Sequence, residues 1–288
     1  MTEIKSCTAS ECTQTSLPAT PRGLTKRNLK LYVRPSMKPT TPQTPNIPAI
    51  ATELRQDSRL SPQMLLEDAE TATCLWRLKE FVSPSVARLA LCKNGSQFLN
   101  RHRSEVAVLF CDLRGFTDFV NKATADEADL FLRDYHHCLD NYFRLYDATL
   151  DHRAGDGAMV FIGDPNVFHP PIRALAHAAK LARDLRSAMK TLLQQWTARG
   201  YGLGFGIGLA YGIATIGVIS SGYRSDYTAS GRVVVLASRL CDCARSGQIL
   251  VPSNVKEALG DIADFKPLTP IKLKGFDQQT ETHNLISC

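Results

Sequence analysis

The sequence lacks long apolar runs and any regular pattern of cysteines. No stretch reaches the roughly 18 apolar residues of a membrane-spanning helix, and the N-terminus has no continuous apolar segment of the secretory type. The nine cysteines are odd in number and scattered, so a disulfide framework is not expected. Cys241 and Cys243 are one residue too close for the usual CxxC metal or redox pair. We therefore expect a cytoplasmic protein whose cysteines are small buried side chains.

A basic surface on folded structure is also missing. The formal charge is +6, but nine Lys or Arg stand against four Asp or Glu within residues 1–60 alone. The remaining chain is close to neutral, which argues against a nucleic-acid-binding domain, because such a domain needs a basic face. A basic tail can contact an acidic regulatory partner or an anionic membrane, but more often such a tail is only solvated.

Residues 1–60 have too few apolar side chains to form a core of their own. They hold seven of the fifteen prolines, which exclude a sustained helix or central strand. We expect a disordered, Pro/Thr-rich tail. Residues 61–103 are predicted to form a helical linker that starts at Ser61 and Pro62, with a second short helix over residues 83–91. This linker is either a plain extension or an element that transmits a signal.

From residue 104 to residue 288 the pattern changes to strands and helices. A short apolar run at residues 106–111 predicts a buried central strand, and Gly155 to Gly157 predicts a tight hairpin. Three helices are predicted, at residues 125–145, 172–198 and 232–244. Further strands are predicted at residues 149–153, 158–162, 203–211, 214–219, 248–251 and 271–274. The hairpins imply antiparallel pairs, so we expect an α+β fold with one antiparallel-rich sheet and helices on one main face.

Two carboxylates of this region can carry chemistry. Asp112 directly follows the first predicted strand, and Asp156 lies at the tip of the predicted hairpin. One or two carboxylates together with substrate phosphates can hold Mg²⁺. A pair of such ions can activate an attacking oxygen and stabilise a leaving phosphate. From spacing alone, a helix cap at Asp112 and a turn residue at Asp156 are the simpler interpretation.

The residues around both aspartates resemble a known family. Residues 110–117 read Phe-x-Asp-Leu-x-Gly-Phe-Thr, and a Gly-Asp-Gly-x-Met pattern begins at Gly155. These are similar to the two metal-binding signatures of class III adenylate and guanylate cyclases. Further matches follow in the same order as in the family, at residues 204–208, 226–231, 236–240 and 273–275. The resemblance spans residues 104–286 and implies the ferredoxin-like, palm-type fold of these cyclases.

The resemblance also implies an activity and a set of site residues. The expected reaction makes cyclic AMP and pyrophosphate from ATP in a homodimer. Asp112, Asp156 and the backbone carbonyl of Leu113 would hold two Mg²⁺ or Mn²⁺ ions. The backbone N–H groups of Gly115, Phe116 and Thr117 would bind the phosphates. His152 and Thr228 would contact the base. Arg239 would stabilise the charge that develops on the phosphate, and Lys274 would bind the terminal phosphate. The aspartates of one subunit would meet His152, Thr228, Arg239 and Lys274 of the other subunit.

Two positions depart from the family pattern. His152 stands where a lysine usually reads adenine, and Val235 stands where an asparagine usually orients the ribose. Losing one transition-state donor costs about 10²- to 10³-fold in rate, which predicts a slow enzyme. Guanylate cyclases typically have Glu and Cys at the positions of His152 and Thr228, so adenine is the favoured base. The alternative is a cyclase-like module that holds nucleotide, or only dimerises, in a regulatory role. A receiver domain with Asp112 as phosphoacceptor does not suit the hairpin at Asp156.

Overall fold

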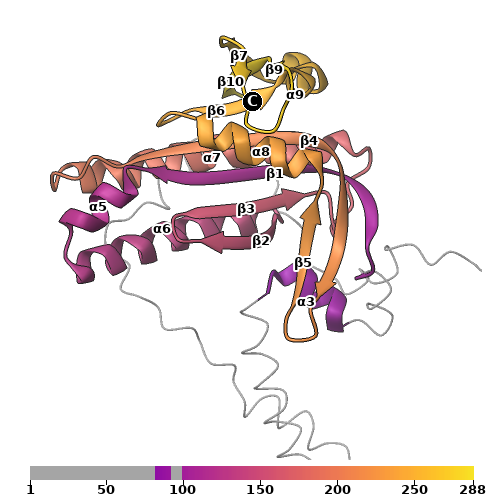
Figure 1. Cartoon of the computed structure of the whole chain (residues 1–288), viewed down its shortest axis with the longest axis horizontal. Coiled ribbons are helices and arrows are strands. Elements are labelled where there is room, and N and C mark those ends of the chain that lie inside the picture. Colours follow the sequence, from indigo (N-terminus) through magenta and orange to yellow (C-terminus); the bar gives the residue numbers. More distant parts are fainter. Residues whose placement is uncertain (1–81, 92–98) are drawn as a thin grey trace, which may run out of the picture. The chain divides into compact units, whose positions relative to one another are not determined.

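The computed structural model describes residues 82–91 and 99–288 of the chain (Figure 1). The predicted tail at residues 1–60 and the helix predicted to begin at Ser61 lie outside these residues. Of the predicted linker, the short helix α3 (Pro84–Leu91) is described, and it agrees with the predicted range of 83–91. Every helix within the described ranges is too short or too polar to form a membrane span.

Four strands and two long helices form the centre of the fold. The strands lie side by side in the order β2-β3-β1-β4, and each neighbouring pair is antiparallel. Helix α6 connects β1 to β2, and helix α7 connects β3 to β4, which is the ferredoxin-like arrangement. The predicted α+β class is therefore confirmed. The bounds are β1 His102–Arg114, α6 Ala125–Leu145, β2 Thr149–Ala154, β3 Gly157–Ile162, α7 Ile172–Thr197 and β4 Gly204–Ser220.

Further strands extend the sheet beyond β4. β6 pairs with β4 in parallel, and β10 and β7 follow. β5 pairs with the second half of β4, and the two form an arm that leaves the centre of the sheet (Figure 1). The remaining bounds are α5 Phe116–Lys122, β5 Ser225–Ser230, α8 Arg232–Cys243, β6 Ile249–Pro252, α9 Ser253–Leu259, a 3₁₀ helix Gly260–Ile262, β7 Asp264–Pro267, β8 Ile271–Lys272, β9 Gln279–Thr280 and β10 Thr282–Ser287.

Helices cover both faces of the sheet, which corrects the prediction of one main face. Alternate residues of β1 point to opposite sides. Leu109 and Cys111 belong to the core formed with α6 and α7. Val106 and Val108 belong to a second core that includes residues of α8. The sequence did not separate these faces because the residues of β1 from Val106 to Cys111 are apolar on both sides.

Two predicted strands have different limits in the structure. β1 continues through Asp112 to Arg114, so Asp112 lies inside the strand rather than after it. The predicted strands at residues 203–211 and 214–219 are one continuous strand, β4. Residues 212–213, which separate the two predicted strands, are part of it, and Gly212 pairs with Val106 of β1 in the antiparallel ladder. Pairing across the sheet keeps the backbone extended through this glycine.

The core beneath α6 and α7 is rich in aromatic side chains. Phe119 meets Tyr201 at a ring-centroid distance of 4.8 Å and Phe131 at 5.1 Å, and Phe131 meets Trp196 at 5.2 Å. Full burial of one such ring contributes about 1.5–3 kcal/mol. α6 starts at a capping box in which Thr124 and Glu127 satisfy each other's backbone N–H groups. Together these features anchor the predicted helix at residues 125–145, which the structure confirms.

Helix α8 lies directly on the backbone of β4. A Cβ atom added to Gly206 would be 3.0 Å from the carbonyl oxygen of Ala244 and 2.7 Å from Nη2 of Arg114. At Gly208 an added Cβ would collide with the backbone of Ala237 and Cys241 in α8. The glycine-rich strand therefore lets a helix approach closely.

Candidate active site

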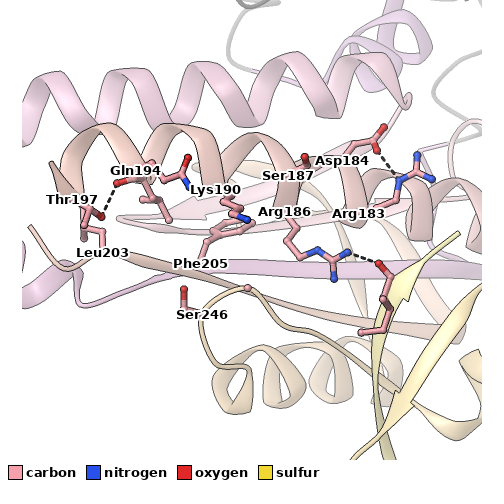
Figure 2. A pocket seen from close by; sticks show the side chains of 13 residues that line it. Arg183, Asp184, Arg186, Ser187, Lys190, Gln194, Thr197, Leu203, Phe205 and Ser246 are labelled. Carbon is pink, nitrogen blue, oxygen red and sulfur yellow. Dashed lines mark hydrogen bonds and ion pairs between the residues drawn. The ribbon is translucent and has the colours of Figure 1, made fainter. Parts of the chain in front are cut away.

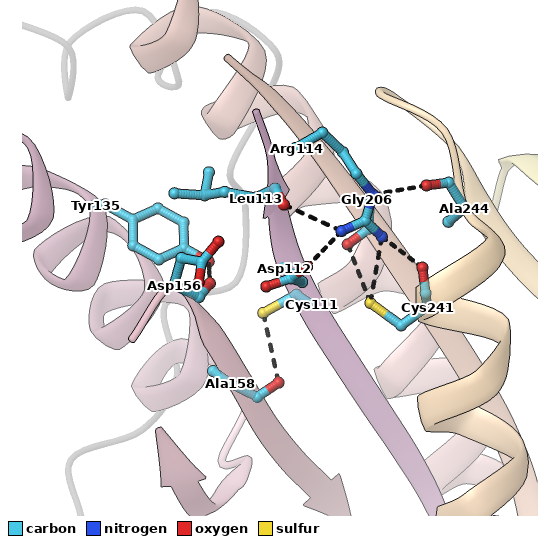
Figure 3. A network of polar contacts seen from close by, with 10 residues as sticks. All are labelled: Cys111, Asp112, Leu113, Arg114, Tyr135, Asp156, Ala158, Gly206, Cys241 and Ala244. Carbon is cyan, nitrogen blue, oxygen red and sulfur yellow. Dashed lines mark hydrogen bonds and ion pairs between the residues drawn. The ribbon is translucent and has the colours of Figure 1, made fainter. Parts of the chain in front are cut away.

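Asp112 and Asp156 lie side by side at one end of the central strands (Figure 3). Asp112 sits near the end of β1, and Asp156 is in the turn between β2 and β3. Oδ1 of Asp112 faces Gly157, where an added Cβ would be only 3.4 Å away. Burial, together with the negative charge of Asp112, raises the pKa of Asp156. The two predicted metal ligands are therefore brought together, with a local excess of negative charge.

The side chain of Arg114 holds the other oxygen of Asp112. Its Nη1 donates to Oδ2 of Asp112 at 2.5 Å and to the carbonyl oxygen of Leu113 at 3.1 Å. Its Nε donates to the carbonyl oxygen of Ala244 at 2.8 Å, and its Nη2 donates to that of Cys241. A cation at these carbonyls also suits the C-terminus of helix α8. Arg114 thus connects the metal-site strand to the helix that carries Arg239.

Asp156 is held in place from the opposite side by Tyr135 of α6. The Tyr135 hydroxyl donates to the backbone oxygen of Asp156 at 2.7 Å, and the ring is fully buried. Burial raises the pKa of Tyr135 well above its usual value, so this hydroxyl stays protonated and continues to donate. The hairpin tip is therefore fixed to the core rather than left as a free turn.

The donor atoms at this place fit a hard divalent cation. Two carboxylates and the nearby Leu113 carbonyl offer oxygen atoms, and burial together with the charge of Asp112 raises the pKa of Asp156. No cluster of three or more His, Cys, Asp or Glu with metal-site geometry occurs among residues 82–91 and 99–288. The protein would thus supply only part of a coordination shell, which suits Mg²⁺ or Mn²⁺ shared with substrate phosphates.

The loop after β1 has a backbone that requires glycine. Gly115 has φ 77°, and an added Cβ would be 2.7 Å from the carbonyl oxygen of Gly202. Helix α5 begins at Phe116, with no side chain capping its N-terminus. Phe116 packs against Phe119 at 5.9 Å, while Thr117 is exposed. The predicted phosphate-binding segment therefore follows Asp112 directly, at the start of a short helix.

The buried carboxylate of Asp151 joins His152 to the strand that carries Thr228. Asp151 accepts from Nδ1 of His152 at 2.8 Å and from the backbone N–H of Ala229 at 3.0 Å. Ala229 follows Thr228 on β5. His152 also meets the ring of Phe110 on β1 edge-on at 6.4 Å. The structure thus brings His152 and the backbone next to Thr228 to a shared partner.

Val235 and Arg239 lie one turn apart on α8. The Val235 side chain is 45% exposed and offers no hydrogen bond. Arg239 pairs with Asp242 at 2.9 Å, while its buried Nε has no partner among the described residues. Lys274 is exposed, and its neighbour Leu273 packs in a cluster with Leu240 of α8. Lys274 is therefore placed beside the C-terminal half of α8.

A separate cavity of about 760 Å³ lies along α7 (Figure 2). It contains none of the predicted site residues. Arg186 in its wall donates to the carbonyl oxygens of Leu285 and Ile286, at 2.7 Å and 2.5 Å. Phe205 of β4 also lines it and belongs to the core under α6 and α7, on the face of the sheet opposite α8. This cavity is therefore distinct from the pair of aspartates.

Sequence reasoning missed the side chains of Arg114, Tyr135 and Asp151. A signal existed: residues two apart on a strand share a face, so a strand extended through residue 114 places Arg114 beside Asp112. No comparable signal pointed to Asp151, because neighbouring residues of a regular strand point to opposite faces.

The fold and the paired aspartates together define a nucleotide cyclase catalytic domain. Residues 99–287 match the family model described as the adenylate and guanylate cyclase catalytic domain. The chain therefore belongs to this family. Domains of this kind bind a nucleotide substrate, generally depend on divalent metal ions and typically dimerise.

Particular relatives agree with this assignment. The structure resembles that of the adenylyl cyclase CyaB from P. aeruginosa, with 30% identity and a TM-score of 0.63, covering 66% of this chain and 97% of the other. It also resembles the guanylyl cyclase Cya2, with 27% identity and a TM-score of 0.58, covering 65% and 92%. Adenylate cyclase 1 of Rhizobium meliloti (strain 1021) is 24% identical over 189 residues, covering 64% of this chain and 28% of that protein.

An uncharacterised protein of Mycobacterium tuberculosis (strain ATCC 25618 / H37Rv) is 30% identical over 185 residues. The match covers 62% of this chain and 31% of that protein. The chain thus spans less than a third of the length of these curated relatives.

Proposed function

We propose that this domain is an adenylate cyclase that converts ATP into 3′,5′-cyclic AMP and pyrophosphate. The pairing of Asp112 and Asp156, with the Leu113 carbonyl beside them, is the observation that supports this most. These three groups would hold two Mg²⁺ or Mn²⁺ ions. Such ions, when bound, lower the pKa of an attacking hydroxyl and neutralise a leaving phosphate.

The protein's own side chains have complementary roles in this proposal. Arg114 orients the carboxylate of Asp112, and Tyr135 fixes the backbone of Asp156. Arg239 supplies positive charge for the phosphate in the transition state, and Lys274 binds the terminal phosphate. The backbone N–H groups of Gly115, Phe116 and Thr117 bind phosphate oxygens at the start of α5.

We propose that the active unit is a homodimer in the cytoplasm. The aspartates of one subunit would face His152, Thr228, Arg239 and Lys274 of the other, giving two equivalent sites. Exposed apolar side chains support an interface on the arm formed by β4 and β5. Ile213 is 56% exposed, Ile219 44% and Tyr223 at the turn 100%. An acidic regulatory partner for the basic segment at residues 1–60 is also part of this proposal.

A catalytically weak module is the second candidate. Val235 supports it, because a half-exposed valine cannot orient a ribose hydroxyl. In this reading the domain binds nucleotide or dimerises without appreciable turnover. The active enzyme is favoured because the chain keeps the expected site residues Asp112, Asp156, Arg239 and Lys274.

The deciding experiment measures cyclic nucleotide formed from ATP and from GTP with Mn²⁺. Wild type is compared with Asp112→Asn, and Asp129→Asn serves as the matched control. Asp129 is an exposed carboxylate on α6 paired with Arg133, so its substitution removes the same charge away from the site. We expect cyclic AMP from wild type and the control, and at least a roughly 10²-fold loss in Asp112→Asn.

Circular dichroism must show that both variants remain folded. Equal product from Asp112→Asn and wild type would contradict the proposal. No product from wild type at high protein concentration would favour the binding module.

A further inference from the structure

Asp151 carries a buried carboxylate that has no role in the proposed reaction. Its side chain is 6% exposed, whereas that of His152 is 51% exposed. Oδ1 of Asp151 contacts Nδ1 of His152 at 2.8 Å, and Oδ2 accepts from the N–H of Ala229 at 3.0 Å. One carboxylate therefore joins β2 to β5, two strands that are not neighbours in the ladder of the sheet.

A break in the strand register makes this contact possible. In the β2–β3 pairing, Leu150 lies opposite Val160 and His152 lies opposite Met159, so Asp151 is an extra residue of β2. Such a bulge re-aims side chains that would otherwise alternate between the two faces. Asp151 and His152 can therefore hydrogen-bond to each other although they are adjacent in sequence.

The hydrogen bond fixes which nitrogen of His152 carries a proton. An ionised carboxylate only accepts hydrogen bonds, so Nδ1 must be the donor. Within the described residues no hydrogen bond engages Nε2. In the neutral ring Nε2 is then an acceptor, and in the protonated ring it is a donor. The edge-on contact with Phe110 further restricts the ring orientation.

We propose that Asp151 positions His152 so that Nε2 faces N1 of the purine, and that protonation of His152 selects between adenine and guanine. This rests on the proposed function. Position N1 is an acceptor in adenine and carries a hydrogen in guanine. Protonated His152 therefore matches adenine, and neutral His152 matches guanine. Thr228 would face the substituent at C6 and suits both bases, because a hydroxyl both donates and accepts.

The charges around His152 favour its protonated form. The hydrogen bond to Asp151 raises the pKa of His152, burial lowers it, and the charges of Asp151 and Asp226 raise it further, so the net direction is upward. Asp226 on β5 is itself paired with Arg224, and Arg153, the next residue of β2, is paired with Asp140. Phe110 and Met159, from β1 and β3, bring no charge. ATP is therefore favoured at lower pH, and GTP gains as pH rises through the pKa of His152.

The first test follows base preference with pH in the full chain. The ratio of kcat/KM for ATP to that for GTP is measured with Mn²⁺ from mildly acidic to mildly basic pH. We expect the ratio to fall about tenfold or more in wild type, since a mismatched hydrogen bond to the base is unfavourable. His152→Lys should keep a high, pH-independent ratio, because lysine donates throughout. A wild-type ratio that is independent of pH would overturn the proposal, as would a His152→Lys profile identical to wild type.

The second test does not depend on turnover. The ¹⁵N shifts of the His152 imidazole, assigned by comparison with His152→Gln, report the tautomer and the pKa directly. We expect a proton on Nδ1 in the neutral wild-type ring, and a lower His152 pKa in Asp151→Asn, whose amide can still accept from Ala229. A neutral ring protonated on Nε2, or an unchanged pKa in Asp151→Asn, would overturn the inference.

The two proposals can fail separately. If wild type forms no cyclic product, the proposed function fails, and the pH dependence of ATP and GTP binding is then measured by fluorescence titration. A binding ratio that falls as pH rises, together with the Nδ1–H tautomer, supports the inference without catalysis. A ratio that does not change with pH overturns it.

Discussion

The two faces of the central sheet differ in what they contain. The face covered by α6 and α7 is closed by apolar side chains, including the rings of Phe119, Phe131 and Trp196. The other face is covered mainly by α8, and here lie Asp112 and the polar contacts of Arg114 (Figure 3). Apolar packing dominates the first face, whereas the second face combines a smaller apolar core with the charged groups of the candidate site.

The largest expected effect tests the apolar face. Phe131→Ala removes a fully buried ring that contacts Phe119 and Trp196. We expect a loss of about 3–5 kcal/mol in the free energy of unfolding, measured by urea titration. Turnover of the remaining folded protein should change little at low temperature. Leu130→Ala, at a half-exposed neighbouring position, is the control and should lose far less. Similar losses of stability in both variants would contradict the conclusion that apolar packing on this face stabilises the fold.

A polar network at the rim of the α8 face should have the next largest effect. Asp164 is 4% exposed; it accepts from Tyr227 and contacts Nε2 of His102 at 2.8 Å. Asp164→Ala leaves the buried Tyr227 hydroxyl without this partner, so we expect a loss of about 1–3 kcal/mol in stability. Tyr227→Phe, which removes the hydroxyl as well, should recover part of that loss in the double variant. A double variant less stable than Asp164→Ala would argue against the network.

The same network makes a prediction about pH. Burial lowers the pKa of His102, but the hydrogen bonds to Asn100 and Asp164 and the charge of Asp164 raise it, with a net upward direction. Because the pKa of His102 is higher in the folded than in the unfolded protein, its protonation stabilises the fold. This stabilisation is fully present at a pH below the unfolded-state pKa of about 6.5, and it is lost as the pH rises through the folded-state pKa. The stability gap between wild type and Asp164→Ala should therefore narrow from mildly acidic to mildly basic pH. A gap that widens over that range would contradict the pairing.

A smaller effect, on rate alone, is expected at Val235. Val235→Asn restores a hydrogen-bonding side chain at an exposed position of α8. We expect turnover to rise at least about tenfold with little change in stability, because the substitution touches no core residue. Val120→Asn, at a similarly exposed position of α5, is the control. An unchanged or lower rate would remove Val235 as an explanation for weak activity.

The smallest effect should come from the start of α6. Thr124→Ala breaks the capping box with Glu127 and should cost about 1 kcal/mol of stability, measured by thermal unfolding. Thr124→Ser keeps the hydroxyl and should be close to wild type. Activity should be unaffected in both, since this helix end lies on the apolar side. Equal stability of Thr124→Ala and Thr124→Ser would show that the cap contributes nothing.

Elements with a clear periodic pattern could be predicted from the sequence. Helix α6 was predicted over about residues 125–145 from its apolar spacing, and the structure confirms it. The hairpin at Asp156 was predicted from the glycines on either side of it, Gly155 and Gly157. Asp112 and Asp156 could be singled out because Asp112 follows an apolar run and Asp156 lies in the turn between two predicted strands.

Features that depend on pairing between strands could not be predicted. β1 was cut short at Cys111 because Asp112 and Arg114 are polar, although alternation along a strand permits this on an open face. β4 was divided at Gly212, whose extended backbone is maintained by its partner in β1. The bulge at Asp151 depends on how β2 pairs with β3, and the sequence of one strand alone does not specify that register. The roles of the site residues themselves stay predictions.

The contact between α8 and the bare backbone of β4 has a further consequence for variation. Because Gly206 and Gly208 present no side chains, the seat of the helix cannot be adjusted by exchanging one apolar residue for another. Val235 lies on the exposed side of the helix, away from this contact. A substitution there therefore leaves the seat of α8 on β4 in place.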